Sequence, residues 1–343
     1  MARSKRMSLK DVAAAAGTSV ATASRGLSGA GPVAEKTRQA VLAAARALNY
    51  TPDLRARGLR KQSTRSIGLI IPNLLDAYYM ALADTLSQLL AERRYHFLIA
   101  STRDDPDTEQ EMLHQMTGQV VNGLIWVPTA PSEALSGYLS SQRVCSVSIV
   151  RRVPGDRIDT VVARDRDGSQ LATRHLINLG HRRIGFIGGE ARFSDHYARC
   201  QGYQAALQAA GLAVDEALIK RGPDRSTWGI AALGDLLHLP APPTAIFVDS
   251  NAIMAGVMRA VRARGVPVPD ALSLICFDDM DWFSFSAPPI TAVEFSHARL
   301  AEVALDVLFA RIDHPDEVDR PPVFIEIECD LILRSSTAPC RQP

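Results

Sequence analysis

Polar side chains near the N-terminus have the types and the spacing needed to read DNA. Ser19, Thr22, Ser24 and Arg25 fall within one short stretch, interleaved with small apolar residues. On a helix, an arginine and small side chains can reach base edges, and serine hydroxyls can reach phosphates. We predict that Ser19 and Ser24 contact phosphates. The predicted base contacts come from Val20, Ala21, Thr22 and Arg25.

Three short helices are predicted to position these residues. Apolar spacing indicates the first at about 9–16, and Gly17 suits the left-handed position that ends a helix. Ser19 is a natural N-cap for a second helix at about 20–27, and a third follows at about 35–49. Two helices joined by a glycine turn form a helix-turn-helix, whose second helix enters the major groove. The alternative is an alanine-rich three-helix bundle without a ligand.

Charge is distributed unevenly along the 343 residues. Residues 1–62 hold 12 Lys and Arg against Asp11, Glu35 and Asp53, a net charge of +9. The remainder holds 26 basic and 34 acidic residues, a net charge of −8. A basic head on an acidic body indicates that an anionic polymer is the partner of the head only.

Composition excludes several classes of protein. Hydrophobic residues make up 47% of the chain, yet no apolar run approaches the ~20 residues that span a bilayer. No apolar stretch follows the basic N-terminus, so we expect a cytoplasmic, nucleoid-associated protein without a secretory signal and without a membrane partner. The five cysteines are scattered without a CxxC motif, so we expect reduced thiols and no metal site.

From Ser66 onward, short β-rich runs alternate with helical segments, which is typical of βαβ units and parallel sheets. About ten such units are too many for one small sheet, so we predict two Rossmann-like subdomains. The predicted strands are 67–71, 96–100, 123–127, 144–150, 184–188, 245–248 and 274–277. The predicted helices include 77–93, 169–179, 197–210 and 251–265.

The residues of the body do not predict an enzyme or a bound cofactor. No full GxGxxG motif follows the first strand, which argues against a nicotinamide oxidoreductase. No serine stands in a GxSxG motif, and the eight histidines are dispersed. Asp278 and Asp279 are neighbours in sequence, so at a strand end their side chains would point apart.

Motifs along nearly the whole chain resemble the lactose/galactose repressor (LacI/GalR) family of bacterial transcription regulators. The head carries LKDVAAAAGTSVATASR, VAEKTRQAV and LNYTP, and the body begins with SIGLIIP. Later segments in the family's order are TRHLINLGHRRIGFIGG (173–189), FDD (277–279), PPITAV (288–293) and LILRSST (331–337). The resemblance implies a small all-α helix-turn-helix head and an α/β body of two periplasmic-binding-protein-like subdomains.

The resemblance also implies a domain organisation. The DNA-binding head, residues 1–62, would end in a hinge helix at about 53–60 that folds when a dimer binds DNA. The family's hinge leucine, here Leu59, wedges into the minor groove and bends the duplex. Leu9 and Tyr50 complete the predicted DNA-contacting set. The effector-binding and dimerisation domain, 63–343, would contain an N-subdomain (about 63–162 and 293–322) and a C-subdomain (about 163–292 and 323–340).

Four residues are predicted to bind an effector in the cleft of the body. Asp278 and Arg199 match the family's ligand-binding aspartate and arginine, and could hold sugar hydroxyls or a carboxylate. Tyr78 belongs to an aromatic pair, and Ser250 stands where the family commonly has an Asn-Asp pair. Asp278 and Arg199 each have an alternative role if the resemblance is set aside. Asp278 is then as readily explained as a helix N-cap, and Arg199 is better explained as a surface ion-pair partner.

We therefore predict a homodimeric transcriptional regulator, most simply a repressor, that binds a near-palindromic double-stranded operator. Its small-molecule effector is expected to be a sugar or a sugar derivative such as a sugar acid. A phosphoprotein co-regulator is the alternative within this class. A solute-binding protein is a further alternative, and the basic head argues against it.

Overall fold

A computed structural model describes most of the chain: residues 7–28, 32–48, 50, 65–118, 121–129, 131–142, 144–155, 157–315 and 320–341. The chain divides into two compact units, a head (Met1–Thr64) and a body (Arg65–Pro343). The predicted hinge helix at 53–60, with Leu59, lies outside the described residues. Over those described ranges, no helix is both long enough and apolar enough to cross a membrane.

The head contains the three predicted helices, α1 (Leu9–Ala15), α2 (Val20–Ser28) and α3 (Glu35–Ala47). Gly17 has a φ of +62°, so it occupies the left-handed position expected after α1. The Ser19 hydroxyl accepts the backbone N–H of Thr22 at 3.1 Å, which confirms Ser19 as the N-cap of α2. Ala34 gives α3 no side-chain cap.

Small side chains set the spacing of the head helices. The buried residues of its core are Val12, Ala13, Ala23, Val41 and Ala45. A Cβ atom added at Gly26 would lie 3.3 Å from a methyl group of Val41. The glycine therefore lowers the helix propensity of α2 but permits close packing of α2 on α3.

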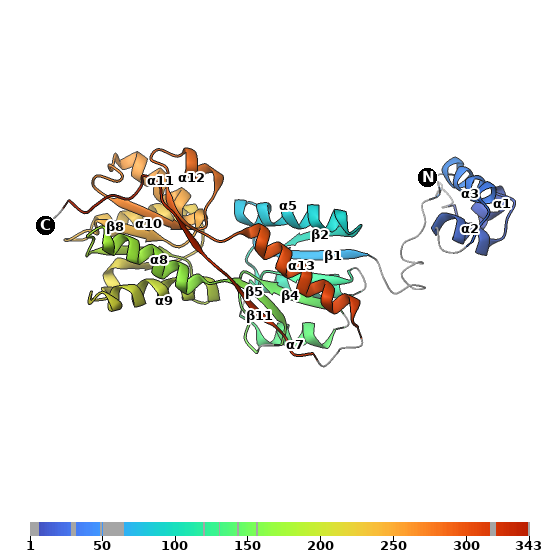
Figure 1. Cartoon of the computed structure of the whole chain (residues 1–343), viewed down its shortest axis with the longest axis horizontal. Coiled ribbons are helices and arrows are strands. Elements are labelled where there is room, and N and C mark those ends of the chain that lie inside the picture. The colour runs from blue at the N-terminus through green and yellow to red at the C-terminus, as the bar shows by residue number, and fades with distance from the viewer. Residues whose placement is uncertain are drawn as a thin grey trace. The chain divides into compact units, whose positions relative to one another are not determined.

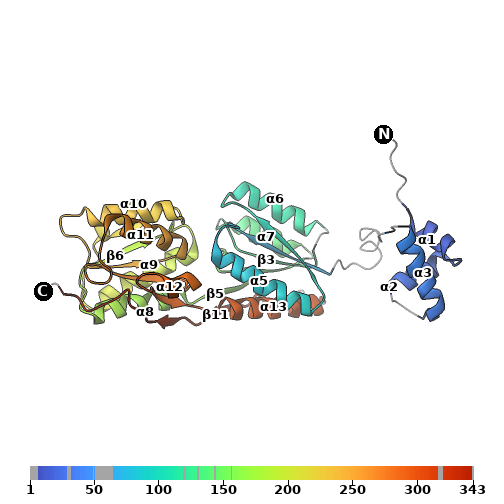
Figure 2. The same cartoon turned by 90° about the horizontal axis from the view of Figure 1, so that it is seen from above.

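The body contains two six-stranded sheets (Figures 1 and 2). The first sheet is entirely parallel, with the order β11-β5-β4-β3-β1-β2. The second has the order β12-β10-β9-β8-β6-β7 and is parallel except for the pair β10–β12. The first set of strands is β1 (Ser66–Ile71), β2 (His96–Ser101), β3 (Gly123–Trp126), β4 (Cys145–Ile149), β5 (Asp159–Ala163) and β11 (Phe324–Ile327). The second set is β6 (Ile184–Gly188), β7 (Ile219–Arg221), β8 (Ala245–Val248), β9 (Ser273–Phe277), β10 (Thr291–Glu294) and β12 (Asp330–Ile332).

Helices cover both faces of each sheet, so the central strands are apolar throughout (Figure 2). In the first subdomain, α5 and α13 pack together on one face, opposite α6 and α7; in the second, α8 and α9 lie opposite α10 and α11. The helices of the first subdomain are α5 (Ala77–Glu92), α6 (Pro106–Thr117), α7 (Glu133–Ser141) and α13 (His297–Asp313). Those of the second are α8 (Asp165–Asn178), α9 (Ser194–Ala209), α10 (Ser226–Leu237), α11 (Asn251–Arg264) and α12 (Asp281–Phe285), with a 3-10 turn at Glu216–Leu218.

The chain crosses between the two subdomains three times, and two of these crossings differ from the predicted boundaries. β10 pairs with β9, so the second crossing follows Glu294 instead of preceding residue 293. β11 pairs with β5, so the third crossing follows Ile327 instead of residue 322. β11 is a short, largely exposed edge strand, and its sequence therefore lacks the apolar run of a central strand.

Glycines allow α10 and α11 to pack at very short distance. A Cβ atom at Gly229 would lie 2.2 Å from the carbonyl oxygen of Ile253, and one at Gly256 would lie 1.8 Å from that of Ser226. These obstacles are backbone atoms, so they cannot rotate away. At Gly234, also on α10, the nearest atom would be the movable guanidinium of Arg264 at 3.1 Å.

We predict opposite effects from two alanine substitutions in α10. Gly229→Ala should lower the free energy of unfolding by about 2 kcal/mol or more, because the helices must move apart. Gly234→Ala should leave it unchanged or raise it by up to ~1 kcal/mol, because alanine is the better helix former. Urea unfolding of the two variants compares them directly. Equal stability of both variants would contradict the close helix packing.

Candidate functional site

The exposed face of α2 carries the side chains that were predicted to contact DNA. Val20 is 41% exposed, and Ala21 and Arg25 are exposed as well. The hydroxyls of Ser19 and Thr22 lie 2.8 Å apart at the start of the helix. Arg25 Nε donates a hydrogen bond to the carbonyl oxygen of Ala21 at 3.3 Å. These residues therefore form one surface of small side chains with a single cation.

The other predicted DNA-contacting residues lie differently. Ser24 is partly buried on α2. Leu9 and Tyr50 are also partly buried, and both pack against the core of the head. Their contact with the core indicates that they support α2 in addition to any contact with DNA.

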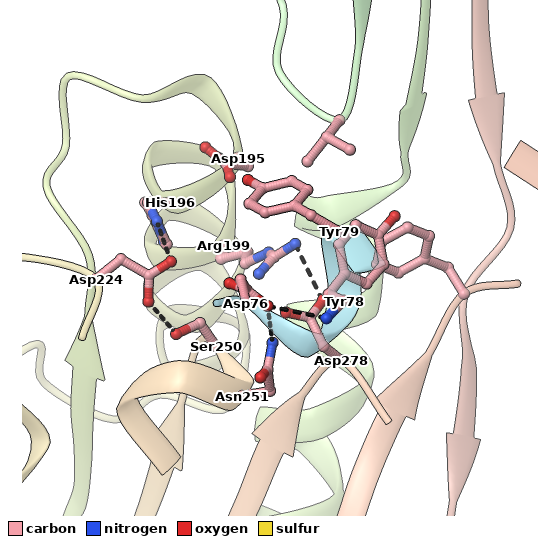
Figure 3. Close-up of a pocket in the computed structure, with 12 residues that line it drawn as sticks. Asp76, Tyr78, Tyr79, Asp195, His196, Arg199, Asp224, Ser250, Asn251 and Asp278 are labelled. Atoms are coloured by element: carbon pink, nitrogen blue, oxygen red, sulfur yellow. Dashed lines mark hydrogen bonds and ion pairs between the residues drawn. The ribbon is translucent and has the colours of Figure 1, made fainter. Parts of the chain in front are cut away.

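A pocket lies between the two subdomains of the body and contains all four predicted effector-binding residues, Tyr78, Arg199, Ser250 and Asp278 (Figure 3). Eight further residues line it: Asp76, Tyr79, Val150, Asp195, His196, Asp224, Asn251 and Phe295. The first subdomain contributes residues that follow β1 and β4, and the second contributes residues that follow β6, β7, β8 and β9. The pocket thus lies at the carboxyl ends of parallel strands, where open α/β sheets bind ligands.

The backbone is strained at two positions in this pocket. Val150, directly after β4, has a φ of +65°, and Asp278, directly after β9, has a φ of +68°. Aspartate tolerates the left-handed region, whereas a β-branched valine is a clear outlier there. Such strain costs of order 1–3 kcal/mol and persists where the surrounding structure holds it, commonly at ligand sites.

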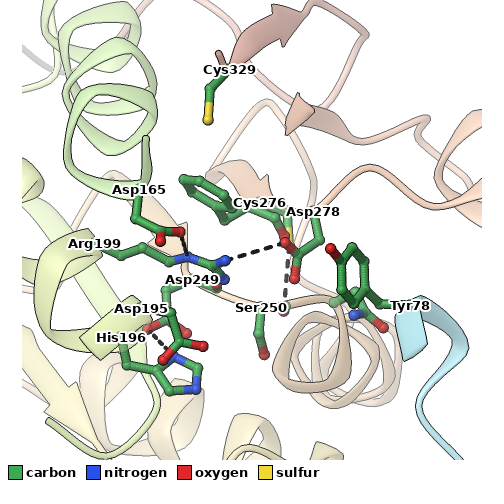
Figure 4. Close-up of polar contacts among 12 residues, drawn as sticks. Tyr78, Asp165, Asp195, His196, Arg199, Asp249, Ser250, Cys276, Asp278 and Cys329 are labelled. Atoms are coloured by element: carbon green, nitrogen blue, oxygen red, sulfur yellow. Dashed lines mark hydrogen bonds and ion pairs between the residues drawn. The ribbon is translucent and has the colours of Figure 1, made fainter. Parts of the chain in front are cut away.

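Arg199 is the most heavily bonded side chain of the pocket (Figure 4). It is only 3% exposed, and its guanidinium stacks 3.8 Å above the ring of Phe277. Its Nε donates to Asp165 at 2.8 Å, and its Nη1 donates to the carbonyl oxygen of Asp249 at 2.6 Å. Its Nη2 lies 3.5 Å from Asp278 Oδ1. Asp165 and the backbone of Asp249 thus hold the guanidinium in place beside the carboxylate of Asp278.

A second cation, His196, lies in the first turn of α9 and lines the same pocket. Its Nδ1 donates to Asp249 at 2.9 Å, and its Nε2 lies 3.6 Å from Asp224. Burial acts to lower the pKa of His196, but the carboxylates of Asp249 and Asp195 outweigh it and raise this pKa well above its ordinary value. His196 is therefore a buried cation, and Asp224 in turn accepts the hydroxyl of Ser250.

Burial and neighbouring charges shift the pKa values of the carboxyl groups that line the pocket. Burial, and then the neighbouring Asp224, raise the pKa of Asp76 to about 7. Burial also raises the pKa of Asp278, although Arg199 opposes that shift. Burial acts in the same direction on Asp195, but His196 and then Arg151 lower the pKa of its carboxyl. Asp76 has no cation among its bonded neighbours in the pocket, since it accepts from the backbone of Tyr78 and from the side chain of Asn251.

The carboxylates do not form a metal centre in the part of the chain that the structure describes. No group of three or more His, Cys, Asp or Glu side chains in that part is placed to hold a metal ion. The arrangement instead offers hydrogen-bond acceptors and negative charge beside aromatic rings.

Comparisons with known proteins match both units of the chain. The family described as "Bacterial regulatory proteins, lacI family" matches residues 8–53, and "Periplasmic binding protein-like domain" matches residues 173–337. The HTH-type transcriptional repressor PurR of Haemophilus influenzae is 30% identical over 328 residues, 96% of this chain and 98% of its own length. The chain belongs to the LacI family. It is a DNA-binding transcriptional regulator and not an enzyme.

Solved LacI-family structures agree with this fold. The complex of the transcriptional regulator CelR with cellobiose has a TM-score of 0.73 at 28% identity, and covers 96% of this chain and 100% of its own. A LacI-family regulator from Mycobacterium smegmatis has a TM-score of 0.72 at 28% identity, over 80% of this chain and 99% of its own. The Lac repressor dimer bound to operator has a TM-score of 0.83 at 23% identity, and the match covers 97% of this chain and 100% of the Lac repressor chain. At that identity it supports the fold alone.

Sequence reasoning missed several residues that line the pocket of this LacI-family chain. They are Asp76, Val150, Asp195, His196 and Asp224. The rule that ligands bind beyond strand carboxyl ends points to Asp76 after β1 and to Val150 after β4, so the ends of these two predicted strands carried a usable signal. Asp195 and His196 were missed because α9 begins at Ser194, earlier than the predicted start at residue 197. Asp224 follows β7, a three-residue strand that was not predicted.

Asp76→Asn should make the folded protein more stable at neutral and alkaline pH. The pKa of Asp76 is about 7 in the folded protein, against an ordinary value of 3.8, so wild type loses stability as pH rises between these values. Asparagine does not ionise and keeps the acceptor for the backbone N–H of Tyr78. We expect the variant to exceed wild type by about 1 kcal/mol above pH ~7 and to match it near pH ~4.

Urea unfolding of both proteins across this pH range measures the difference. A difference that is constant with pH would show that Asp76 ionises normally in the folded protein.

Proposed function

We propose that this chain represses transcription by binding near-palindromic operators as a homodimer, and that a small molecule in the pocket of the body controls its affinity for DNA. The main support for this proposal is one pocket between the two subdomains, which is lined by Tyr78, Arg199, Ser250 and Asp278. Both subdomains contribute to that pocket, so a ligand has different contacts when the cleft is open and when it is closed. Differential affinity of this kind is what shifts a conformational equilibrium.

The head supplies the DNA contacts in this proposal. Ser19 and Ser24 contact phosphates, and Val20, Ala21, Thr22 and Arg25 contact base edges, with Leu9 and Tyr50 beside them. The capped N-terminus and exposed face of α2 support this assignment. The net charge of +9 on residues 1–62 supports strong, salt-dependent attraction to the duplex. Leu59 in the hinge is proposed to enter the minor groove.

The body supplies effector binding and dimerisation. A sugar or a sugar derivative is the proposed effector class, because carboxylate, amide and hydroxyl groups line a pocket that also has aromatic walls. The cellobiose complex of CelR supports the same class. Dimerisation follows from operator symmetry, since two-fold related heads read two half-sites. Because its target is chromosomal DNA, we infer that the protein acts in the cytoplasm.

Arg25→Ala should weaken binding to the selected operator by about 1–3 kcal/mol, since a single arginine on a recognition helix discriminates bases by that amount. Fluorescence anisotropy of operator duplexes recovered from a random pool by the full chain measures it. Arg46→Ala removes the same charge from the exposed end of α3 and should have a smaller effect on all duplexes alike. Unchanged operator affinity in Arg25→Ala would remove the base-reading role from Arg25.

Asp278→Asn should abolish release of DNA by the effector while leaving effector-free operator affinity within about twofold. Asparagine tolerates the left-handed backbone at this position, so the fold is preserved and only the charge is lost. A thermal-shift screen of the full chain with sugars, sugar derivatives and nucleobases provides the effector for this measurement, because a bound ligand raises the melting temperature. Normal release of DNA from Asp278→Asn would show that the pocket is not the effector site.

A further inference from the structure

The carboxylates at the cleft outnumber the cations that could neutralise them. Three carboxylates each have a close cation partner: Asp165 with Arg199 at 2.8 Å, Asp249 with His196 at 2.9 Å and Asp195 with Arg151 at 3.3 Å. Asp76, Asp224 and Asp278 remain, and all three line the pocket. Asp224 and Asp278 lie 3.6 and 3.5 Å from His196 and Arg199, which are already shared with closer carboxylates.

These three carboxylates come from opposite sides of the cleft (Figure 3). Asp76 caps α5 of the first subdomain, whereas Asp224 follows β7 and Asp278 follows β9 in the second. Like charges repel in a buried site, and the repulsion from Asp224 and Asp278 adds to burial in raising the pKa of Asp76. A ligand that carries positive charge removes this repulsion, and a ligand that carries negative charge increases it.

Other groups in the pocket also indicate a bound ligand. The hydroxyl of Tyr78 is buried and has no hydrogen-bond partner among the described residues, and the residue is only 8% exposed. A buried tyrosine hydroxyl that lines a pocket without a partner can accept a hydrogen bond from a ligand or donate one to it. The rings of Tyr78 and Phe295 lie 5.4 Å apart, and Tyr79 contacts Tyr78 edge to face at 5.6 Å. Aromatic faces of this kind attract ammonium groups.

We propose that the effector of this regulator carries a protonated amine, which binds between Asp76 on one subdomain and Asp224 and Asp278 on the other. This proposal rests on the proposed function, because it specifies the chemistry of the ligand in the same pocket. The amine donates to the carboxylates, and its charge is stabilised by the tyrosine and phenylalanine rings. Arg199 Nε and Nη1 already donate to protein acceptors. His196 Nε2 has no hydrogen-bond partner among the described residues, but it faces Asp224 at 3.6 Å, so an anionic ligand would have to compete with that carboxylate.

The test uses the full chain and matched sets of compounds that differ only in charge. The sets are N-methylglucamine, glucitol and gluconate; putrescine, butanediol and succinate; and benzylamine, benzyl alcohol and benzoate. We expect an amine to raise the melting temperature and to change operator affinity, and its alcohol and acid counterparts to do neither at the same concentration.

Substitutions identify the groups that bind the amine. Asp76→Asn and Asp224→Asn should each weaken its binding at least tenfold, as measured by calorimetry. Asp235→Asn removes the same charge from the exposed face of α10, and it should leave the affinity unchanged. Asp76→Asn is expected to be at least as stable as wild type. Weaker amine binding by this variant therefore cannot be attributed to misfolding.

The proposal is overturned if no amine binds, if an alcohol or an acid binds as tightly as its amine, or if amine binding survives both pocket substitutions. These results differ from failure of the proposed function. If glucitol or gluconate releases operator DNA through the pocket, effector control stands and only the charge class is wrong. If the chain selects no operator, the proposed function fails whatever the pocket binds.

Discussion

The buried guanidinium of Arg199 is the interaction on which the effector pocket depends. Removing a cation from water carries a large penalty, which opposite charges and hydrogen bonds must offset. Arg199 meets that requirement by bonding to Asp165 at the start of α8, to the backbone of Asp249 after β8, and to Asp278 after β9. One side chain on α9 therefore holds the ends of three other elements in place.

This pairing also determines how the remaining charges are distributed. Asp165 directly follows the first crossing between subdomains, so the network lies beside the hinge as well as beside the pocket. Carboxylates that are bound to the interior cations have fixed orientations. The carboxylates with no cation of their own are left facing the cleft. The pocket therefore combines a bonded network of charges with unbalanced negative charge, and this combination makes ligand binding sensitive to the charge of the ligand.

The head is built on a different principle. Its buried core consists of three alanines and two valines, and the sequence of residues 1–62 carries a net charge of +9. A core of this size stabilises a domain only modestly, since buried apolar area is the main source of stability. We therefore expect contacts with the DNA backbone to add to the stability of the head on its operator. Recognition and ligand sensing thus use different physical sources of free energy within one chain.

Local sequence determined most of the elements and the residues at their ends. Gly17 and Ser19 define the turn before α2 because left-handed backbone and N-capping are local properties. The apolar runs of β1, β3, β8 and β9 identify buried strands because both faces of a parallel sheet are covered. The position of Asp278 after such a strand was likewise visible in the sequence, as was that of Arg199 in its family motif.

Only the tertiary structure decided which carboxylates are neutralised and which face the pocket. Asp76, Asp165, Asp224 and Asp249 are far apart in sequence and look alike there, yet Asp165 and Asp249 bind cations while Asp76 and Asp224 do not have one to themselves. Five short strands were not predicted: β5, β7, β10, β11 and β12. Three of them, β7, β11 and β12, lie at sheet edges, and β5 and β10 are the strands next to β11 and β12. The pairing of charges and the pairing of short strands both depend on residues that are close in space but distant in sequence. Those residues come together only when the two sheets have formed.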